Sequence, residues 1–298
     1  MGPPRIGTVG RRLKELWPLL PAVLYLVGFL AVVLAYLVML SFSTDMRGSG
    51  FPTLEPVRRV LATREFAEAL TNTLVFTVVG TPIELLAGLA LALLLYRSFR
   101  GRNLVRSVLL IPLAIPTLVT ATVLFILFDY PGGHINHLLR GSYAFFPQVV
   151  NSPINWRADK TFALGISLLG KVWRDMPISM LILAAGLNAI DPELLDAART
   201  MGAGFRKRMV SIMLPLIVPS IASVVLLRSL EMWKEFVFPF VLAGRYDLLG
   251  TLIESLYRNW GRTNDAAVVG LGLVMCILVS TGLLLWVLGG LKRRLLHE

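Results

Sequence analysis

The chain has 298 residues, of which 56% are hydrophobic and only 16% are charged. Because a water-soluble domain does not need so much apolar surface, the composition indicates an integral membrane protein. The formal net charge of +11 is also typical of nucleic-acid-binding proteins, but the positions of the basic residues exclude that class. The basic residues are concentrated in short loops that the expected topology places on one side of a membrane.

Apolar runs of roughly 20 residues, the length that spans a bilayer core, occur six times. We expect an all-α membrane protein with six transmembrane helices, at residues 19–40, 73–96, 104–128, 162–187, 209–230 and 266–291. A transmembrane domain over 19–291 would then be flanked by an N-terminal segment, 1–18, and a tail, 292–298. Prolines within the runs predict kinked helices: Pro82, Pro112, Pro116, Pro177, Pro215 and Pro219.

With the N-terminus placed inside, the inside segments hold 15 of the 29 basic residues but only five of the 18 acidic ones. The outside segments hold eleven of each. This asymmetry predicts that both termini are cytoplasmic, in a multi-pass protein of the inner cell membrane. We interpret the basic 97–106 loop as a topology determinant that faces anionic lipid.

The outside segments are longer. Residues 41–72 predict a short amphipathic helix around 56–70, and residues 129–161 predict an ordered loop rich in Gly, Pro and aromatic residues.

The sequence carries no pattern typical of an enzyme. We find neither a phosphate-binding G-x-x-x-x-G-K-[ST] loop nor a Ser–His–Asp arrangement. His134 and His137 lie among Gly and Asn residues without convergent carboxylates, so we expect no metal site. The single cysteine, Cys276, cannot form an intrachain disulfide. We therefore expect a non-enzyme without a cofactor of its own, which takes its energy from a partner.

A polar segment, 188–208, lies between the fourth and fifth runs. Asp191 can cap a helix that begins with Pro192 and Glu193, and Gly202 would end it. Ala197 and Ala198 give that helix a face of small residues that another surface can approach closely. A second helix is expected from about Gly204, so the segment predicts a helix–Gly–helix elbow that inserts into a groove of a partner.

This elbow resembles the signature of the membrane subunits of ATP-binding-cassette importers, which reads Glu-Ala-Ala, three residues, Gly, and later Ile-x-Leu-Pro. The matching residues are Asp196-Ala197-Ala198, Gly202-Ala203 and Ile212-x-Leu214-Pro215. The chain departs from the family pattern at Asp196, where Glu is usual, and at Met201, where sugar-type members have Asp.

Further stretches resemble the carbohydrate, maltose/trehalose-permease-like branch. They are Asn72-Thr73-Leu74, residues 84–93, Trp173 with Pro177, and Gly186-Leu187.

The resemblance implies a type I importer permease fold and a multi-subunit complex. Its other members would be a second homologous permease subunit, two ATPase subunits that bind ATP and Mg, and an extracytoplasmic solute-binding protein. The elbow would be the coupling helix, with contacts to an ATPase from Glu193, Asp196, Ala197, Ala198, Gly202 and Ala203.

Charged residues recur on one face of each of two apolar runs: Lys171, Arg174 and Asp175 in the fourth, and Arg228, Glu231 and Glu235 in the fifth. Since charge inside a bilayer is costly, these groups either pair with one another or line a polar cavity. Lys171 or Arg174 could pair with Glu231 or Glu235, and Arg228 with Asp175. Glu84, in the second run, is expected to anchor a neighbouring helix.

The resemblance to maltose-type relatives implies solute contacts near Lys171, Asp175, Arg228, Glu231 and Glu235, with a further contribution around Thr120. Trp173 and Trp233 would supply rings that stack on a sugar, or would anchor the helices at the membrane interface.

The main hypothesis is thus a permease subunit of an ATP-driven importer for a carbohydrate such as trehalose or maltose. Glycerol phosphate and polyols are alternative solutes. Two alternatives from other classes are an ion-gradient-driven secondary transporter and a membrane-bound scaffold or enzyme subunit.

Overall fold

The computed structural model describes residues 17–143 and 145–296, and every regular element in those ranges is helical. The expected all-α fold class is thereby confirmed. Most of the expected N-terminal segment, 1–18, lies outside the described residues, as does the end of the tail. The long helices are α2 (Leu20–Ser41), α4 (Arg64–Tyr96), α8 (Lys160–Asn188), α12 (Val218–Trp233) and α15 (Thr263–Leu296).

Shorter helices connect them. On the way from α2 to α8 these are α3 (Glu55–Leu61), α5 (Arg102–Ala114), α6 (Thr117–Leu127) and α7 (His134–Leu139). Later in the chain they are α9 (Pro192–Thr200), α10 (Phe205–Arg208), α11 (Leu214–Leu216), α13 (Val237–Leu242) and α14 (Leu249–Glu254). A 3-10 turn, Trp17–Leu19, precedes α2, and π-helical turns cover Met209–Met213 and Ser255–Asn259.

Three helices are long and apolar enough to cross a membrane by themselves: α2, α4 and the 263–290 part of α15. Three bent pairs pass the same test together, namely α5 with α6, α8 with α9, and the Phe205–Leu216 stretch with α12. By length and composition the described residues therefore hold three spans, or up to six if each bent pair counts as one.

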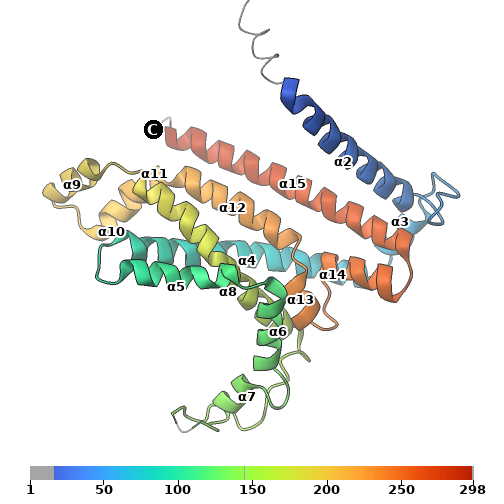
Figure 1. The fold of residues 1–298 in the computed structure, drawn as a ribbon, viewed down its shortest axis with the longest axis horizontal. Helices are drawn as coiled ribbons and strands as arrows, with labels where there is room; N and C mark the ends of the chain where they lie inside the picture. The colour runs from blue at the N-terminus through green and yellow to red at the C-terminus, as the bar shows by residue number, and fades with distance from the viewer. Residues whose placement is uncertain (1–16, 144, 297–298) are drawn as a thin grey trace, which may run out of the picture.

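The run expected as one kinked span, 104–128, consists of two helices, α5 and α6, that are bent by 94°. The break falls at Ile115, whose backbone is extended because Pro116 follows it. With 13 residues α5 is about 20 Å long, less than the ~30 Å of a bilayer core. The bend turns α6 away from the other long helices, with α7 at its far end (Figure 1).

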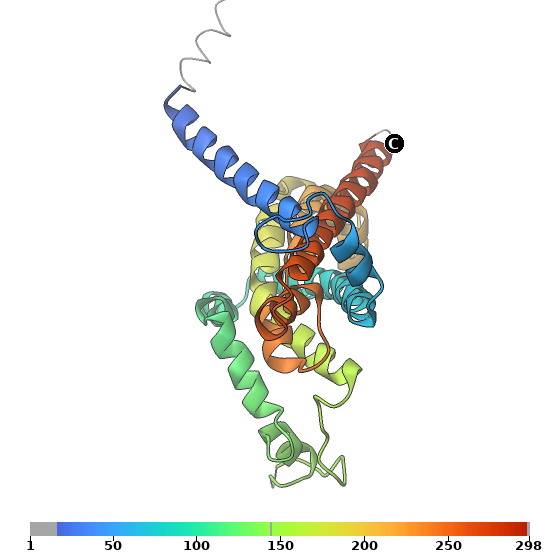
Figure 2. The same cartoon turned by 90° about the vertical axis from the view of Figure 1, so that its right-hand side faces the viewer.

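Helices α4, α5, α8 and α12 lie side by side, and α9 and α10 project from one end of this bundle (Figure 1). The inner part of the bundle is filled by a cluster of buried apolar side chains that includes Met180, Leu183, Leu187, Ile217 and Val224. Seen from the end, α2 and α15 diverge from one another (Figure 2).

Small residues set the distance between α4 and α8. A Cβ atom added at Gly88 on α4 would lie 2.6 Å from the Cβ of Ser179 and 3.0 Å from the backbone nitrogen of Met180. The two helix backbones therefore touch at this level, and no larger residue fits without moving one of them.

A polar clasp fixes the end of α2 to the start of α15. The buried side-chain amide of Asn264 donates hydrogen bonds to the carbonyls of Leu40 (2.9 Å), Ser43 (2.9 Å) and Asp45 (3.1 Å). Beside it, Arg59 on α3 donates to the buried Asp265 carboxylate, and this hydrogen bond raises the pKa of the Arg59 guanidinium above its ordinary value. The clasp leaves the rest of α2 largely exposed.

We expect Gly88→Ala to lower the stability of the protein by about 1–3 kcal/mol, because overpacking forces α4 and α8 apart. Gly165→Ala is the matched control, since Gly165 also lies within a long helix but has no atom within 4 Å of an added Cβ. That change should be neutral or stabilising, by up to about 1 kcal/mol of helix propensity. Thermal unfolding in detergent, followed by circular dichroism, measures both, and equal effects would contradict the close approach.

Candidate functional site

The charged residues of α8 and α12 meet in the middle of the bundle. The Lys171 Nζ atom lies 2.7 Å from an Asp175 carboxylate oxygen and 2.9 Å from Glu235, with Glu231 at 3.9 Å. Glu235 also accepts a hydrogen bond from the backbone N–H of Phe238, which holds its carboxylate at the start of α13. The expected pairing between the two helices is therefore present.

Arg228 extends the network to a third helix. Its guanidinium donates to Glu84 on α4 at 3.1 Å and lies 3.8 Å from Asp175 on α8. The expected role of Glu84 as an anchor to a neighbouring helix is confirmed. The arrangement joins α4, α8 and α12 by ion pairs near the middle of their lengths.

Burial divides the charged residues into two groups. Five form a buried charge cluster: Glu84, Lys171, Asp175, Arg228 and Glu235. The others form a rim that remains open: Arg174, Glu231 and Lys234, with side chains 25%, 33% and 57% exposed. Arg174 bonds to Asp175 and Lys234 bonds to Glu231, so each rim cation has a carboxylate beside it.

Several buried polar atoms near the cluster have no protein partner in the part of the chain that the structure describes. They include the second carboxylate oxygen of Glu84, the Nε of Arg228, and the hydroxyls of Thr81, Ser179 and Ser229. A buried polar atom ordinarily finds water when it has no protein partner. The interface between α4, α8 and α12 therefore contains further buried polar groups besides its ion pairs.

The two candidate stacking residues lie in different environments. Trp233 is only 4% exposed and packs in an apolar cluster with Leu249, Leu252 and Val269, so it offers no ring to a solute in this structure. Trp173 is exposed and lines an apolar groove of about 340 Å³ between α6 and α8, together with Thr120. The structure thus brings Trp173 and Thr120 together and removes Trp233 from the site.

The elbow forms as the sequence predicts. The Asp191 side chain accepts a hydrogen bond from the N–H of Glu193 and caps α9, and Gly202 follows the helix with a φ of +80°. That backbone conformation favours glycine because it has no Cβ. Leu195 is the buried residue of α9, whereas Asp196 and Ala197 are exposed and Met201 is 86% exposed.

Two contacts hold the elbow to the bundle. The Arg97 guanidinium lies 4.6 Å above the ring of Phe205 in α10. The buried Leu195 side chain joins the apolar cluster of α4, α8 and α12. Asp196 faces outward, and Arg199 at 3.3 Å is its ion-pair partner among the described residues.

Sequence reasoning missed one polar feature of this end of the bundle. Arg102 and Arg106, interpreted as topology determinants, line a cavity together with Tyr96 and Asn188. The spacing of four residues between them could have predicted that both side chains lie on one face of a helix. His134 contacts the Tyr143 hydroxyl, and no group of three metal-ligating side chains occurs in the described ranges.

Residues 84–297 match the family described as binding-protein-dependent transport system inner membrane component. The chain belongs to this family. Membership makes it a membrane component of a transport system and supports the importer hypothesis over the secondary-transporter alternative. The matched region begins at Glu84 and includes the elbow and both charged helices.

Two curated relatives are transport permeases. The trehalose/maltose transport system permease protein MalF of Thermococcus litoralis is 33% identical over 65% of this chain and 63% of its own length. The trehalose transport system permease protein SugA of Mycobacterium tuberculosis is 30% identical over 87% of this chain and 81% of its own.

Solved structures share the fold. A chain of a bacterial ABC transporter that imports the acidic polysaccharide alginate matches with a TM-score of 0.80 at 19% identity, over 96% of this chain and 98% of that one. A second structure is of a bacterial alginate ABC transporter in complex with an alginate-pentasaccharide-bound periplasmic protein. A chain of it matches with a TM-score of 0.78 at 20% identity, over 93% of this chain and 95% of that one. At these identities the likeness concerns the fold alone.

Removing the Arg228 side chain should strongly lower the stability of the protein. We expect Arg228→Ala to cost about 3–5 kcal/mol, because it leaves Glu84 buried without its partner. Lys234→Ala, which breaks the exposed pair with Glu231, should cost less than about 1 kcal/mol. The free energy of unfolding from SDS titration in mixed micelles measures both.

The double change Glu84→Met with Arg228→Met is a further control. It should recover most of the lost stability, since Asp175 keeps Lys171 and Arg174. A double variant as unstable as Arg228→Ala would contradict this account of the pair.

Proposed function

We propose that the chain is one permease subunit of an ATP-driven, binding-protein-dependent carbohydrate importer. With a second homologous permease subunit it forms the translocation pathway, and two ATPase subunits that bind ATP and Mg drive the cycle. An extracytoplasmic binding protein delivers the solute. The family match and the names of the trehalose and trehalose/maltose relatives support this function.

The observation that carries the coupling role is the exposed elbow. Its helix α9 stands at one end of the bundle, capped by Asp191, and presents Asp196, Ala197 and Met201 outward. Small and protruding apolar side chains beside a carboxylate fit a groove that has an apolar floor and a basic rim. In this proposal Glu193, Asp196, Ala197, Ala198, Gly202 and Ala203 meet the ATPase on the cytoplasmic side, and both termini lie on that side.

The ion pairs favour a neutral solute. The charged groups of the cluster and its rim comprise equal numbers of acids and bases, and each has an opposite charge beside it. An anion such as glycerol phosphate would need an uncommitted cation to offset its loss of hydration. A neutral sugar needs only hydrogen-bonding groups, so a disaccharide or oligosaccharide fits the site better.

Within the site, we assign solute contact to the rim and positioning to the buried cluster. Glu231, Arg174 and Trp173 are open, whereas Lys171, Asp175, Arg228 and Glu235 are enclosed by the helices that they join. Thr120 lies with Trp173 at the groove between α6 and α8. The buried groups fix the rotamers of the rim side chains through Asp175 and Lys171.

Reversing the charge at the elbow tests the coupling role. We expect Asp196→Lys to cost about 2–5 kcal/mol of binding to the ATPase, and hence to lower solute uptake at least about 10-fold. Uptake into proteoliposomes that contain the assembled importer measures this effect. Glu65→Lys, an equal charge change on an exposed residue at the other end of α4, should leave uptake unchanged. Normal uptake by the Asp196→Lys complex would refute the coupling role.

A second substitution tests the rim. We expect Glu231→Ala to raise the half-saturating solute concentration about 10- to 100-fold, the effect of losing a hydrogen bond from a charged group. ATPase activity in the absence of solute should be retained. Glu254→Ala, which breaks a comparable exposed pair with Arg258, is the control. Loss of both activities together with poor assembly would show that Glu231 serves the fold instead.

A further inference from the structure

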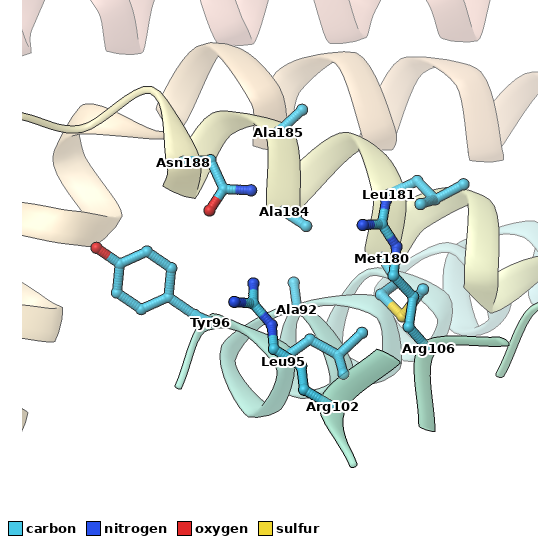
Figure 3. Close-up of a pocket in the computed structure, with 10 residues that line it drawn as sticks. All are labelled: Ala92, Leu95, Tyr96, Arg102, Arg106, Met180, Leu181, Ala184, Ala185 and Asn188. Atoms are coloured by element: carbon cyan, nitrogen blue, oxygen red, sulfur yellow. The ribbon is translucent and has the colours of Figure 1, made fainter. Parts of the chain in front are cut away.

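A cavity of about 170 Å³ lies at the elbow end of the bundle, where α4 and α8 end and α5 begins. It is separate from the charged cluster in the middle of the bundle. Figure 3 shows the guanidinium groups of Arg102 and Arg106 reaching from α5 toward α8, with Ala92 and Ala184 between them. The side-chain amide of Asn188 projects into the same space (Figure 3).

The two arginines differ from their basic neighbours because both line this cavity, and neither takes part in an ion pair within the described ranges. Arg97 stacks on Phe205, and Arg199 pairs with Asp196. Arg102 and Arg106, by contrast, concentrate two positive charges beside a wall of alanine, leucine and methionine side chains. Arg102 is half-buried and Arg106 is exposed. The apolar wall beside them lowers the local dielectric, so an anion inside the cavity is attracted more strongly than one in open water.

The geometry selects the kind of anion. Guanidinium groups present donors in a planar fork that matches the oxygens of a phosphate. Because Arg102 and Arg106 are four residues apart on one helix, they lie on the same face, and both side chains can contact one phosphate group. The cavity is well above the ~10–15 Å³ that a single water requires, and the Asn188 amide can donate to a third oxygen.

We propose that this cavity binds a phosphate group, held by Arg102, Arg106 and Asn188. The group is either the headgroup phosphate of an anionic phospholipid or a free phosphate. Bound there, it bridges the start of α5 to the last residue of α8, shortly before the Asp191 cap of the elbow. The proposal stands apart from the transport function, because it uses no residue of the rim or of the elbow's exposed face.

The test uses the assembled importer with two probes. Native mass spectrometry after reconstitution in phosphatidylglycerol or phosphatidylcholine nanodiscs detects retained lipid. Thermal unfolding in detergent, with inorganic phosphate against chloride at equal ionic strength, detects free phosphate. Arg102→Gln with Arg106→Gln should weaken binding of the relevant probe at least about 10-fold, the effect of losing charge-assisted hydrogen bonds.

The matched control is Arg100→Gln with Arg206→Gln. It removes the same charge from the same end of the bundle, at exposed residues that do not line the cavity. A second variant, Ala184→Leu, fills the space and keeps both arginines, so it separates loss of the site from loss of charge. It should abolish binding as the double arginine change does.

Each outcome decides. Retention of phosphatidylglycerol that is lost in the double arginine variant and in Ala184→Leu identifies a lipid headgroup. A phosphate-dependent rise in melting temperature that is lost in the same variants identifies a free phosphate. Equal loss in the Arg100/Arg206 control means general attraction to basic residues and overturns the proposal, as does the absence of binding in both arms.

Discussion

Arg228 on α12 lies between Glu84 on α4 and Asp175 on α8, and Lys171 continues the chain of charges to Glu235. In an apolar bundle, helix packing alone leaves rotation and sliding only loosely defined, since one leucine face resembles another. Ion pairs in a region of low dielectric fix both the rotation of a helix and its position along its axis, because any shift leaves a buried charge without a partner. The positions of α4, α8 and α12 relative to one another depend on this network.

The close contact at Gly88 and the charge network support each other. Gly88 allows α4 to approach α8 closely, and Glu84 lies one helical turn before it on α4. The approach places Glu84 of α4 and Asp175 of α8 on either side of the Arg228 guanidinium of α12. The approach would be unfavourable if buried polar groups were left apart, and the ion pairs would be too long if the helices were separated. The small residue and the charged residues therefore act together in setting the distance between α4 and α8.

The sequence predicted those features that depend on residues close together in the chain. The spacing of Lys171 and Asp175 placed them on one face of α8, and the Asp191 and Gly202 signals defined the elbow. Other features depend on packing between distant segments. Pro82 and Pro177 lie inside continuous helices, whereas Pro116 marks a 94° bend. Because the residue type is the same, the packing around each proline decides whether the helix continues or bends there. Trp233 likewise follows the charged face in sequence but turns into an apolar cluster.

The attachment of α2 has a consequence for how the subunit meets its surroundings. Leu40 and Ser41 are the buried residues of this helix, next to the carbonyls that Asn264 holds. From that fixed end, α2 extends away from the bundle (Figures 1 and 2). Because α2 is attached near its C-terminal end, a small change of its angle at the clasp moves its N-terminal end by a large distance. The charge network between α4, α8 and α12 is not part of this attachment. Most of the α2 surface is therefore left open to lipid or to another protein, and covering it requires no change in the charge network.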